Sequence, residues 1–131
     1  MVVHDQDEVS EARQAAVRRE GCIFCRIVAR EVPATEVERT EDLIVIRDAN
    51  PKAPTHLLVI PTRHAATLGE FAATSSAAEL GTLLARAAAV GRAASDGGYR
   101  VVINEGKDGG QTVDHLHLHV LAGRHMTWPP G

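Results

Sequence analysis

The sequence is poor in aromatic residues and shows no excess of positive charge. Only 3% of its 131 residues are aromatic: one tryptophan, one tyrosine and two phenylalanines. Alanine is abundant instead, so we expect helices that pack through small side chains at close approach. The formal net charge of −3 argues against a broad basic surface for nucleic acid. A small anion can still be held locally by backbone N–H groups.

Long apolar runs and cysteines are also scarce. No run of about 18 apolar residues is present for a membrane span, and the N-terminus is polar rather than a signal peptide. We therefore expect a cytoplasmic protein with no membrane partner. The two cysteines, Cys22 and Cys25, form a Cys-x-x-Cys motif. In a reducing compartment this spacing favours a metal clip or a redox pair over a structural disulfide.

The length predicts one domain with a hydrophobic core. Residues 1–20 are predicted to be a flexible leader, either disordered or a short surface helix, and residues 21–131 to be the domain. A long helix should start at the capping box of Ser76 and Glu79 and end before Gly97. Its apolar stripe is predicted to be Leu80, Leu83, Leu84, Ala87, Ala88 and Gly91. A short helix is predicted over 22–29, and strands over 36–40, 43–47, 55–60, 99–104 and 114–121.

The last of these strands has an alternating pattern. Its two faces would carry His115, His117 and His119 on one side and Leu116, Leu118 and Val120 on the other. A helix would spread the same residues around its axis, so the pattern favours a strand. An imidazole can accept a proton, ligate a metal or attack an electrophile. A lone histidine is usually only a hydrogen-bonded residue, but three in alternation favour a reactive face.

The loop before this strand, residues 105–111, is rich in glycine. Backbone N–H groups at Gly109 and Gly110 can converge on a phosphate oxygen, because no side chain blocks the approach. Alone, such a pair usually makes only a tight turn. Beside Thr112 and three histidines, it predicts phosphate binding.

The segment His115-Leu116-His117-Leu118-His119-Val120-Leu121 has the pattern His-φ-His-φ-His-φ-φ, where φ is apolar, and resembles the histidine triad (HIT) superfamily. The resemblance covers about residues 21–131 and includes two further blocks, 48–61 and 104–113. The ending, Gly123-Arg124 and 128–131, is similar to the Hint-like branch, the purine nucleoside phosphoramidases. It implies an α+β HIT-like fold: an antiparallel sheet of about five strands, one long helix across it, and a homodimer joined through the helix and sheet edge.

The resemblance also implies an activity. Members of the branch hydrolyse P–N bonds at the α-phosphate of purine nucleotides such as AMP or GMP, adenylyl-lysine being one substrate. Carried over by position, His117 is the nucleophile, His119 contacts the phosphate, and His56 and His115 support them. Three alternatives stay open: a dinucleoside polyphosphate hydrolase, a non-catalytic AMP-binding sensor or scaffold, and a metal-storage or metal-sensor protein.

The nucleotide-binding residues are likewise implied by position. Asp48 would bind the ribose diol, unless it is an ordinary turn aspartate. Phe24, Ile27 and Ile46 would form an apolar slot for the base, although plain core positions use the same side chains. The phosphate would be held by Asn104, Gly110 and Thr112. Thr112 stands where the branch more often has serine, so the hydroxyl is retained and a methyl group is added.

Four residues match the zinc ligands of many bacterial relatives: Cys22, Cys25, His64 and His115. Two thiolates and two imidazoles suit tetrahedral zinc, and such a site is structural because it leaves no coordination position open. The alternative is a pair of free buried cysteines. No organic cofactor is expected. Trp128 either packs across a dimer interface or folds back on its own sheet.

Overall fold

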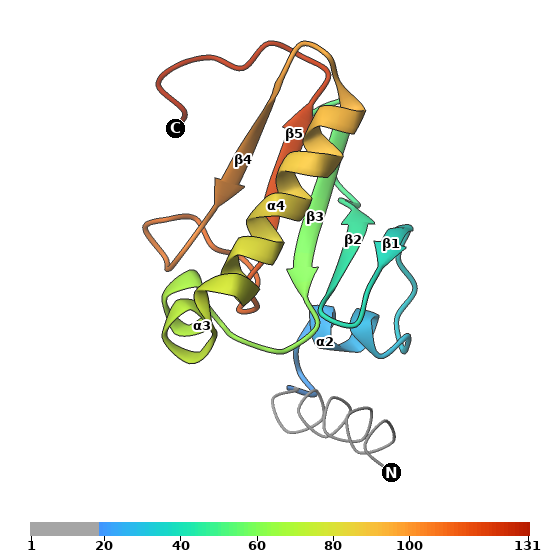
Figure 1. Ribbon diagram of the computed structural model, residues 1–131, viewed down its shortest axis with the longest axis vertical. Helices are drawn as coiled ribbons and strands as arrows, with labels where there is room; N and C mark the ends of the chain where they lie inside the picture. The colour runs from blue at the N-terminus through green and yellow to red at the C-terminus, as the bar shows by residue number, and fades with distance from the viewer. Residues whose placement is uncertain (1–18) are drawn as a thin grey trace.

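The computed structural model describes residues 19–131, so most of the predicted leader lies outside the described residues. One antiparallel sheet has the strand order β1-β2-β3-β5-β4, and helix α4 lies across one of its faces (Figure 1). This confirms the predicted α+β fold. The strands are β1 (Glu36–Arg39), β2 (Leu43–Arg47), β3 (Thr55–Pro61), β4 (Tyr99–Ile103) and β5 (Leu118–Ala122). The helices are α2 (Ile23–Val28), α3 (Leu68–Thr74) and α4 (Ala77–Ala94).

The sheet separates two apolar clusters. Because neighbouring side chains of a strand point to opposite faces, β2 and β3 can be apolar at nearly every position. The cluster under α4 contains Leu43, Val45, Leu57, Val59, Leu83, Ala87, Leu116, Leu118 and Val120. The cluster under α2 contains Phe24, Ile27, Ile44, Ile46, Leu58 and Ile60. The α2 face therefore carries the side chains that the sequence assigns to the base slot.

The histidine strand is shorter than predicted. β5 begins at Leu118, where it pairs with β3 and β4, and not at Asp114. Before it the chain bends, since the His115 N–H bonds to the Val113 carbonyl (2.9 Å) and the Leu116 N–H to the Ala65 carbonyl (2.8 Å). The apolar face is as predicted, because Leu116 still lies in the cluster under α4. The first two histidines precede the paired residues of β5, and the backbone carbonyl of His115 accepts a hydrogen bond from a side chain instead.

Two helices differ from the prediction in detail. Helix α4 has the predicted capping box, but Leu84 is 45% exposed, and Leu83, Ala87 and Gly91 face the core. Residues spaced by four form a narrower stripe than the one predicted, and Leu84 lies one step of about 100° outside it. Helix α2 begins after Cys22, which is its N-cap, and ends at Val28, one residue inside each of the predicted bounds 22 and 29. Among the described residues, no helix is both long and apolar enough to cross a membrane.

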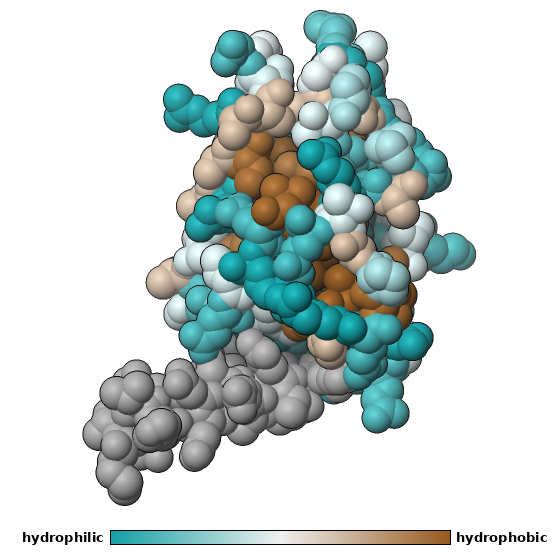
Figure 2. Space-filling model, turned by 90° about the vertical axis from the view of Figure 1, so that its right-hand side faces the viewer, coloured by the Kyte–Doolittle hydropathy of each residue, from teal (hydrophilic) through white to brown (hydrophobic). Residues whose placement is uncertain are grey.

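Apolar surface is limited. Figure 2 shows separate brown areas among hydrophilic side chains on the face it presents. The large apolar side chains recorded as exposed are Ile23, Val37, Leu84 and Trp128. They come from different elements, and scattered exposed apolar residues are usual for proteins in water.

Helix α4 approaches the sheet most closely at Gly91. A Cβ at this position would lie 2.5 Å from the ring of Tyr99, at the start of β4. Helix and sheet therefore pack closely because this position carries no side chain.

We expect Gly91→Ala to destabilise the protein by about 1–3 kcal/mol, because the added methyl group overlaps the tyrosine ring. Gly81→Ala on the same helix is the matched control, since its Cβ meets nothing within 4 Å. It should stabilise the protein by about 0.5–1 kcal/mol through helix propensity. Urea unfolding at one protein concentration measures both, and equal effects would contradict the packing argument.

Candidate active site and metal centre

A cleft of about 730 Å³ opens on the α2 face of the sheet. Seven residues that the sequence assigns to nucleotide binding or catalysis line it: Phe24, Ile27, Ile46, Asp48, Thr112, His117 and His119. They come from α2, the end of β2, the bend before β5 and β5 itself. Apolar groups and a few polar groups thus meet in one cavity, which is the usual make-up of a small-molecule site.

His117 has one ring nitrogen fixed. Its Nδ1 lies 2.7 Å from the backbone carbonyl of His115, which can only accept a hydrogen bond. Nδ1 therefore carries the proton, and Nε2 keeps its lone pair. The ring is 6% exposed and packs edge-on against Phe24, with centroids 5.0 Å apart. A neutral imidazole held in this tautomer can act as a nucleophile.

A chain of hydrogen bonds fixes the tautomer of His119 as well. The backbone N–H of Lys52 donates to His56 Nδ1 (3.0 Å), so the proton of His56 is on Nε2. The Nε2–H group of His56 in turn donates to His119 Nδ1 at 2.9 Å. His119 therefore has its own proton on Nε2. Next to His117 in the cleft, it is a hydrogen-bond donor.

Burial keeps both supporting rings neutral. Burial, with smaller contributions from the neighbouring His117 and His56, lowers the pKa of His119 to about 4. Burial also lowers the pKa of His56, against an opposing effect of the Asp48 carboxylate. At neutral pH both His56 and His119 are therefore uncharged, as the hydrogen bonds that fix their tautomers require.

Asp48, His56 and His119 also lie close enough together to resemble a metal site. The hydrogen bonds argue against one, because a ligating nitrogen must present a lone pair and His56 Nε2 carries a proton. Asp48 Oδ2 lies 3.4 Å from this nitrogen. Its carboxylate has further lone pairs to accept hydroxyl groups at the cleft.

The four predicted metal ligands do come together. His115 Nδ1 lies 3.2 Å from Cys22 Sγ, 3.5 Å from Cys25 Sγ and 3.2 Å from His64 Nδ1. Cys25 Sγ lies 3.3 Å from His64 Nδ1. His115 Nε2 donates to the Pro61 carbonyl at 2.9 Å, so its Nδ1 presents a lone pair to the cluster.

These separations fit tetrahedral zinc. Bonds of about 2.3 Å to sulfur and about 2.0–2.1 Å to nitrogen place tetrahedral ligand atoms about 3.3–3.8 Å apart. The observed spacings fall at or slightly below this range. The hydrogen bond from His115 to the carbonyl is also the kind of support that metal-bound histidines usually receive.

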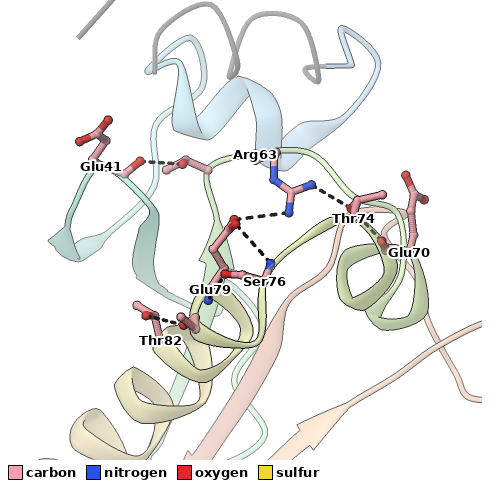
Figure 3. A network of polar contacts seen from close by, with 9 residues as sticks. Glu41, Arg63, Glu70, Thr74, Ser76, Glu79 and Thr82 are labelled. Atoms are coloured by element: carbon pink, nitrogen blue, oxygen red, sulfur yellow. Dashed lines mark hydrogen bonds and ion pairs between the residues drawn. The ribbon is translucent and has the colours of Figure 1, made fainter. Parts of the chain in front are cut away.

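The loop that carries His64 is tied to the helices by a polar network (Figure 3). Arg63 donates to Thr74 Oγ1 (3.1 Å), and its Nη2 lies 3.7 Å from a carboxylate oxygen of Glu79. Thr62 donates to the Glu41 carbonyl at 2.7 Å. The loop that presents His64 to the cluster is therefore bonded to helices α3 and α4 and to the turn between β1 and β2.

Two residues assigned to the phosphate lie outside the lining of the cleft. Asn104 donates to the carbonyl of Gly109 at 2.7 Å, and Gly110 has a φ of +80° in the same loop. The observed role of Asn104 is thus to shape the glycine loop, and its phosphate contact stays a prediction. Conversely, one wall of the cleft, formed by residues 32–35 between α2 and β1, was not predicted from the sequence. Nothing in that short stretch distinguishes it from an ordinary connection.

A family model for the HIT domain matches residues 29–126. The chain belongs to the HIT family. A Zea mays protein named 14 kDa zinc-binding protein is 43% identical over 128 residues, which cover 94% of this chain and 100% of that protein. The structure of a HIT family hydrolase from Legionella pneumophila shares 45% identity with a TM-score of 0.80, covering 85% of this chain and 100% of that one.

A Zn-bound histidine triad family protein from Mycobacterium smegmatis is another structural relative. It shares 33% identity with a TM-score of 0.71, covering 79% of this HIT chain and 76% of its own. These names agree in kind with the two sites of this HIT protein, a histidine-lined cleft and a cysteine–histidine cluster.

The lowered pKa of His119 predicts a pH dependence. Its value of about 4 in the folded chain lies below the ordinary 6.5 of an unfolded one. The unfolded state takes up the proton first, so stability should be full above pH 6.5 and fall as the pH drops towards 4. Imidazole NMR signals should give a midpoint near 4 for His119. A midpoint near 6.5 would show that the ring is not held as described.

Proposed function

We propose that this HIT protein hydrolyses the P–N bond of purine nucleoside phosphoramidates, such as adenylyl-lysine, through a nucleotidyl intermediate on His117. The observation that carries the proposal is the hydrogen bond of His117 Nδ1 to the His115 carbonyl, which leaves Nε2 with a lone pair at the cleft. Binding alone requires no such nucleophile, so this bond favours an enzyme over an AMP-binding sensor. Two structural relatives are named HIT family hydrolases.

The cleft offers a place for each part of a nucleoside monophosphate. Phe24, Ile27 and Ile46 supply the apolar slot for AMP or GMP bases, and Asp48 can accept the two ribose hydroxyls. Thr112 and His119 also line the cleft and can donate to phosphoryl oxygens. Donors at these oxygens stabilise the charge that develops in the transition state.

The proposed reaction has two steps. In the first, the His117 Nε2 lone pair bonds to the α-phosphorus, the P–N bond breaks, and the amine leaves with a proton supplied by the substrate's own phosphate or nitrogen. In the second, water attacks the same phosphorus, the bond to Nε2 breaks, and the nucleoside monophosphate is released. One proton of the water passes to the product phosphate or to solvent. The electron pair of the broken bond returns to Nε2 while Nδ1 keeps its proton, so His117 ends in its starting tautomer.

We further propose a structural zinc ion held by Cys22, Cys25, His64 and His115. The support is the fit of the four ligand atoms to a tetrahedron and the presence of only protein ligands. This agrees with the names of two relatives. Thiolate ligands persist in reducing surroundings, which favours a cytoplasmic location.

A homodimer is proposed through β4 and α4. β4 ends the sheet on one side, and an uncovered edge strand readily pairs with another chain. The five residues of β4 are only half-buried in a single chain. A second copy would cover both this edge and the neighbouring part of α4.

Replacing His117 by alanine should lower kcat for adenosine phosphoramidate by about 10³-fold or more, because the nucleophile is lost. AMP binding should persist, since the slot and Asp48 are unchanged. His125→Ala is the matched control, because this histidine is exposed in the C-terminal tail and should leave turnover unaltered. Steady-state kinetics and calorimetry measure both, and near-normal turnover by the His117 variant would reject the mechanism.

Substrate preference is a separate prediction. The wild-type protein should cleave adenosine phosphoramidate or adenylyl-lysine with a higher kcat/KM than diadenosine polyphosphates. Parallel assays of AMP release measure the ratio. A clear preference for the polyphosphates would contradict the proposed substrate class, although His117 could still be the nucleophile.

A further inference from the structure

We infer that Cys22 and Cys25 are positioning residues of the nucleotide cleft: by ligating zinc, they hold α2 in the place where Phe24 and Ile27 contact the base. Metal loading would then set the affinity for the base of a nucleotide. The inference rests on the proposed nucleotide binding and zinc site but not on turnover.

Helix α2 belongs to both sites. Cys22 is its N-cap and Cys25 lies in its first turn, and both sulfur atoms point to the imidazoles of His64 and His115. Phe24 and Ile27 of the same helix line the cleft. The residues of the metal cluster and those of the base slot therefore interleave along the same short helix.

The helix is too short to be stable by itself. It has 6 residues, whereas isolated helices of fewer than about 12 residues are marginal in water. Its position thus depends on contacts to the rest of the fold. These include the packing of Phe24 against His117 and a hydrogen bond from Arg39 to the Val28 carbonyl (2.9 Å).

Without a metal ion the cluster holds α2 weakly. Two thiolates within 4.8 Å of each other repel, and neutral thiols form only weak hydrogen bonds to the imidazoles. A zinc ion would replace these interactions by four bonds that join α2 to the loop of His64 and to His115.

The groups for ribose and phosphate lie on elements other than α2. Asp48 follows β2, and His119 lies within β5. His117 is oriented by the carbonyl of His115, which is itself held by bonds to Val113 and Pro61 as well as by the cluster. Loss of the metal should therefore weaken contacts to the base and spare those to ribose and phosphate.

The cluster is open to reagents on one side. A second cleft of about 510 Å³ is lined by Cys22 and His64, whereas Cys25 is 3% exposed. We therefore expect a chelator to reach the site through this cleft in the folded chain.

The test compares the full-length protein with bound zinc and after chelation under reducing conditions. Two probes are titrated by calorimetry or by competition: AMP, and ribose 5-phosphate, which lacks the base. We expect the Kd for AMP to rise at least about tenfold on metal removal and the Kd for ribose 5-phosphate to change less than about twofold, the base contacts alone being lost. A purely structural role of the metal would weaken both probes equally.

Three variants complete the test. Cys22→Ala should bind AMP like the metal-free wild type. Cys22→His, which restores a zinc ligand, should recover both zinc content and AMP affinity. Phe24→Ala should lose AMP affinity while still binding zinc, because it removes a side chain that lines the base slot and leaves the four metal ligands unchanged.

Equal AMP affinity with and without zinc, or equal weakening of both probes, would overturn the inference. Failure of phosphoramidate cleavage by a zinc-loaded protein that still binds AMP would instead overturn the proposed reaction. A zinc-loaded protein that binds neither probe would overturn the proposed nucleotide site and this inference together.

Discussion

The site depends on one hydrogen bond, from His117 Nδ1 to the backbone carbonyl of His115. A carbonyl inside a sheet ladder is directed at the neighbouring strand and is poorly placed to accept from a ring in its own strand. The chain leaves the ladder just before Leu118, and this bend frees the carbonyl and brings it to the ring two residues later. The departure from a regular strand is therefore what makes the histidine a defined tautomer.

The same residue links the two sites. The backbone carbonyl of His115 faces His117, while the ring nitrogen Nδ1 of His115 faces the cysteines and His64. Helix α2 is a second link, because its cysteines and its cleft-lining residues alternate along one turn. The cysteine–histidine cluster and the histidine-lined cleft thus share structural elements, although the sequence separates Cys22 from His115 by most of the domain.

The α4 side of the sheet has a different role. Small residues and Gly91 let the helix lie close to the strands, and the leucines of the histidine motif fill the space between. This packing fixes the strands on the α4 face, so that the opposite face can hold the histidine rings at constant separations. Burial on both faces also keeps His119 uncharged, as its low pKa shows.

Much of this arrangement could be predicted from the sequence. Alternation in residues 114–121, the Ser76 capping box and the Cys-x-x-Cys motif are local signals, because strand geometry, helix capping and ligand spacing act over a few residues. They predicted the sheet and the main helix and pointed to the three histidines and two cysteines, whereas the assignment of Asp48, Phe24 and His64 came from the resemblance to the HIT family. Leu84 was misassigned because a helical stripe allows more positions than the sheet can cover.

Only the tertiary structure decided the rest. The start of β5, the cleft wall at residues 32–35 and the role of Asn104 in its own loop all depend on contacts between distant segments. So do the proton positions, since the tautomers of His56 and His119 follow from the backbone N–H of Lys52. A sequence names the groups that can react, whereas the partners that fix each proton are set by packing.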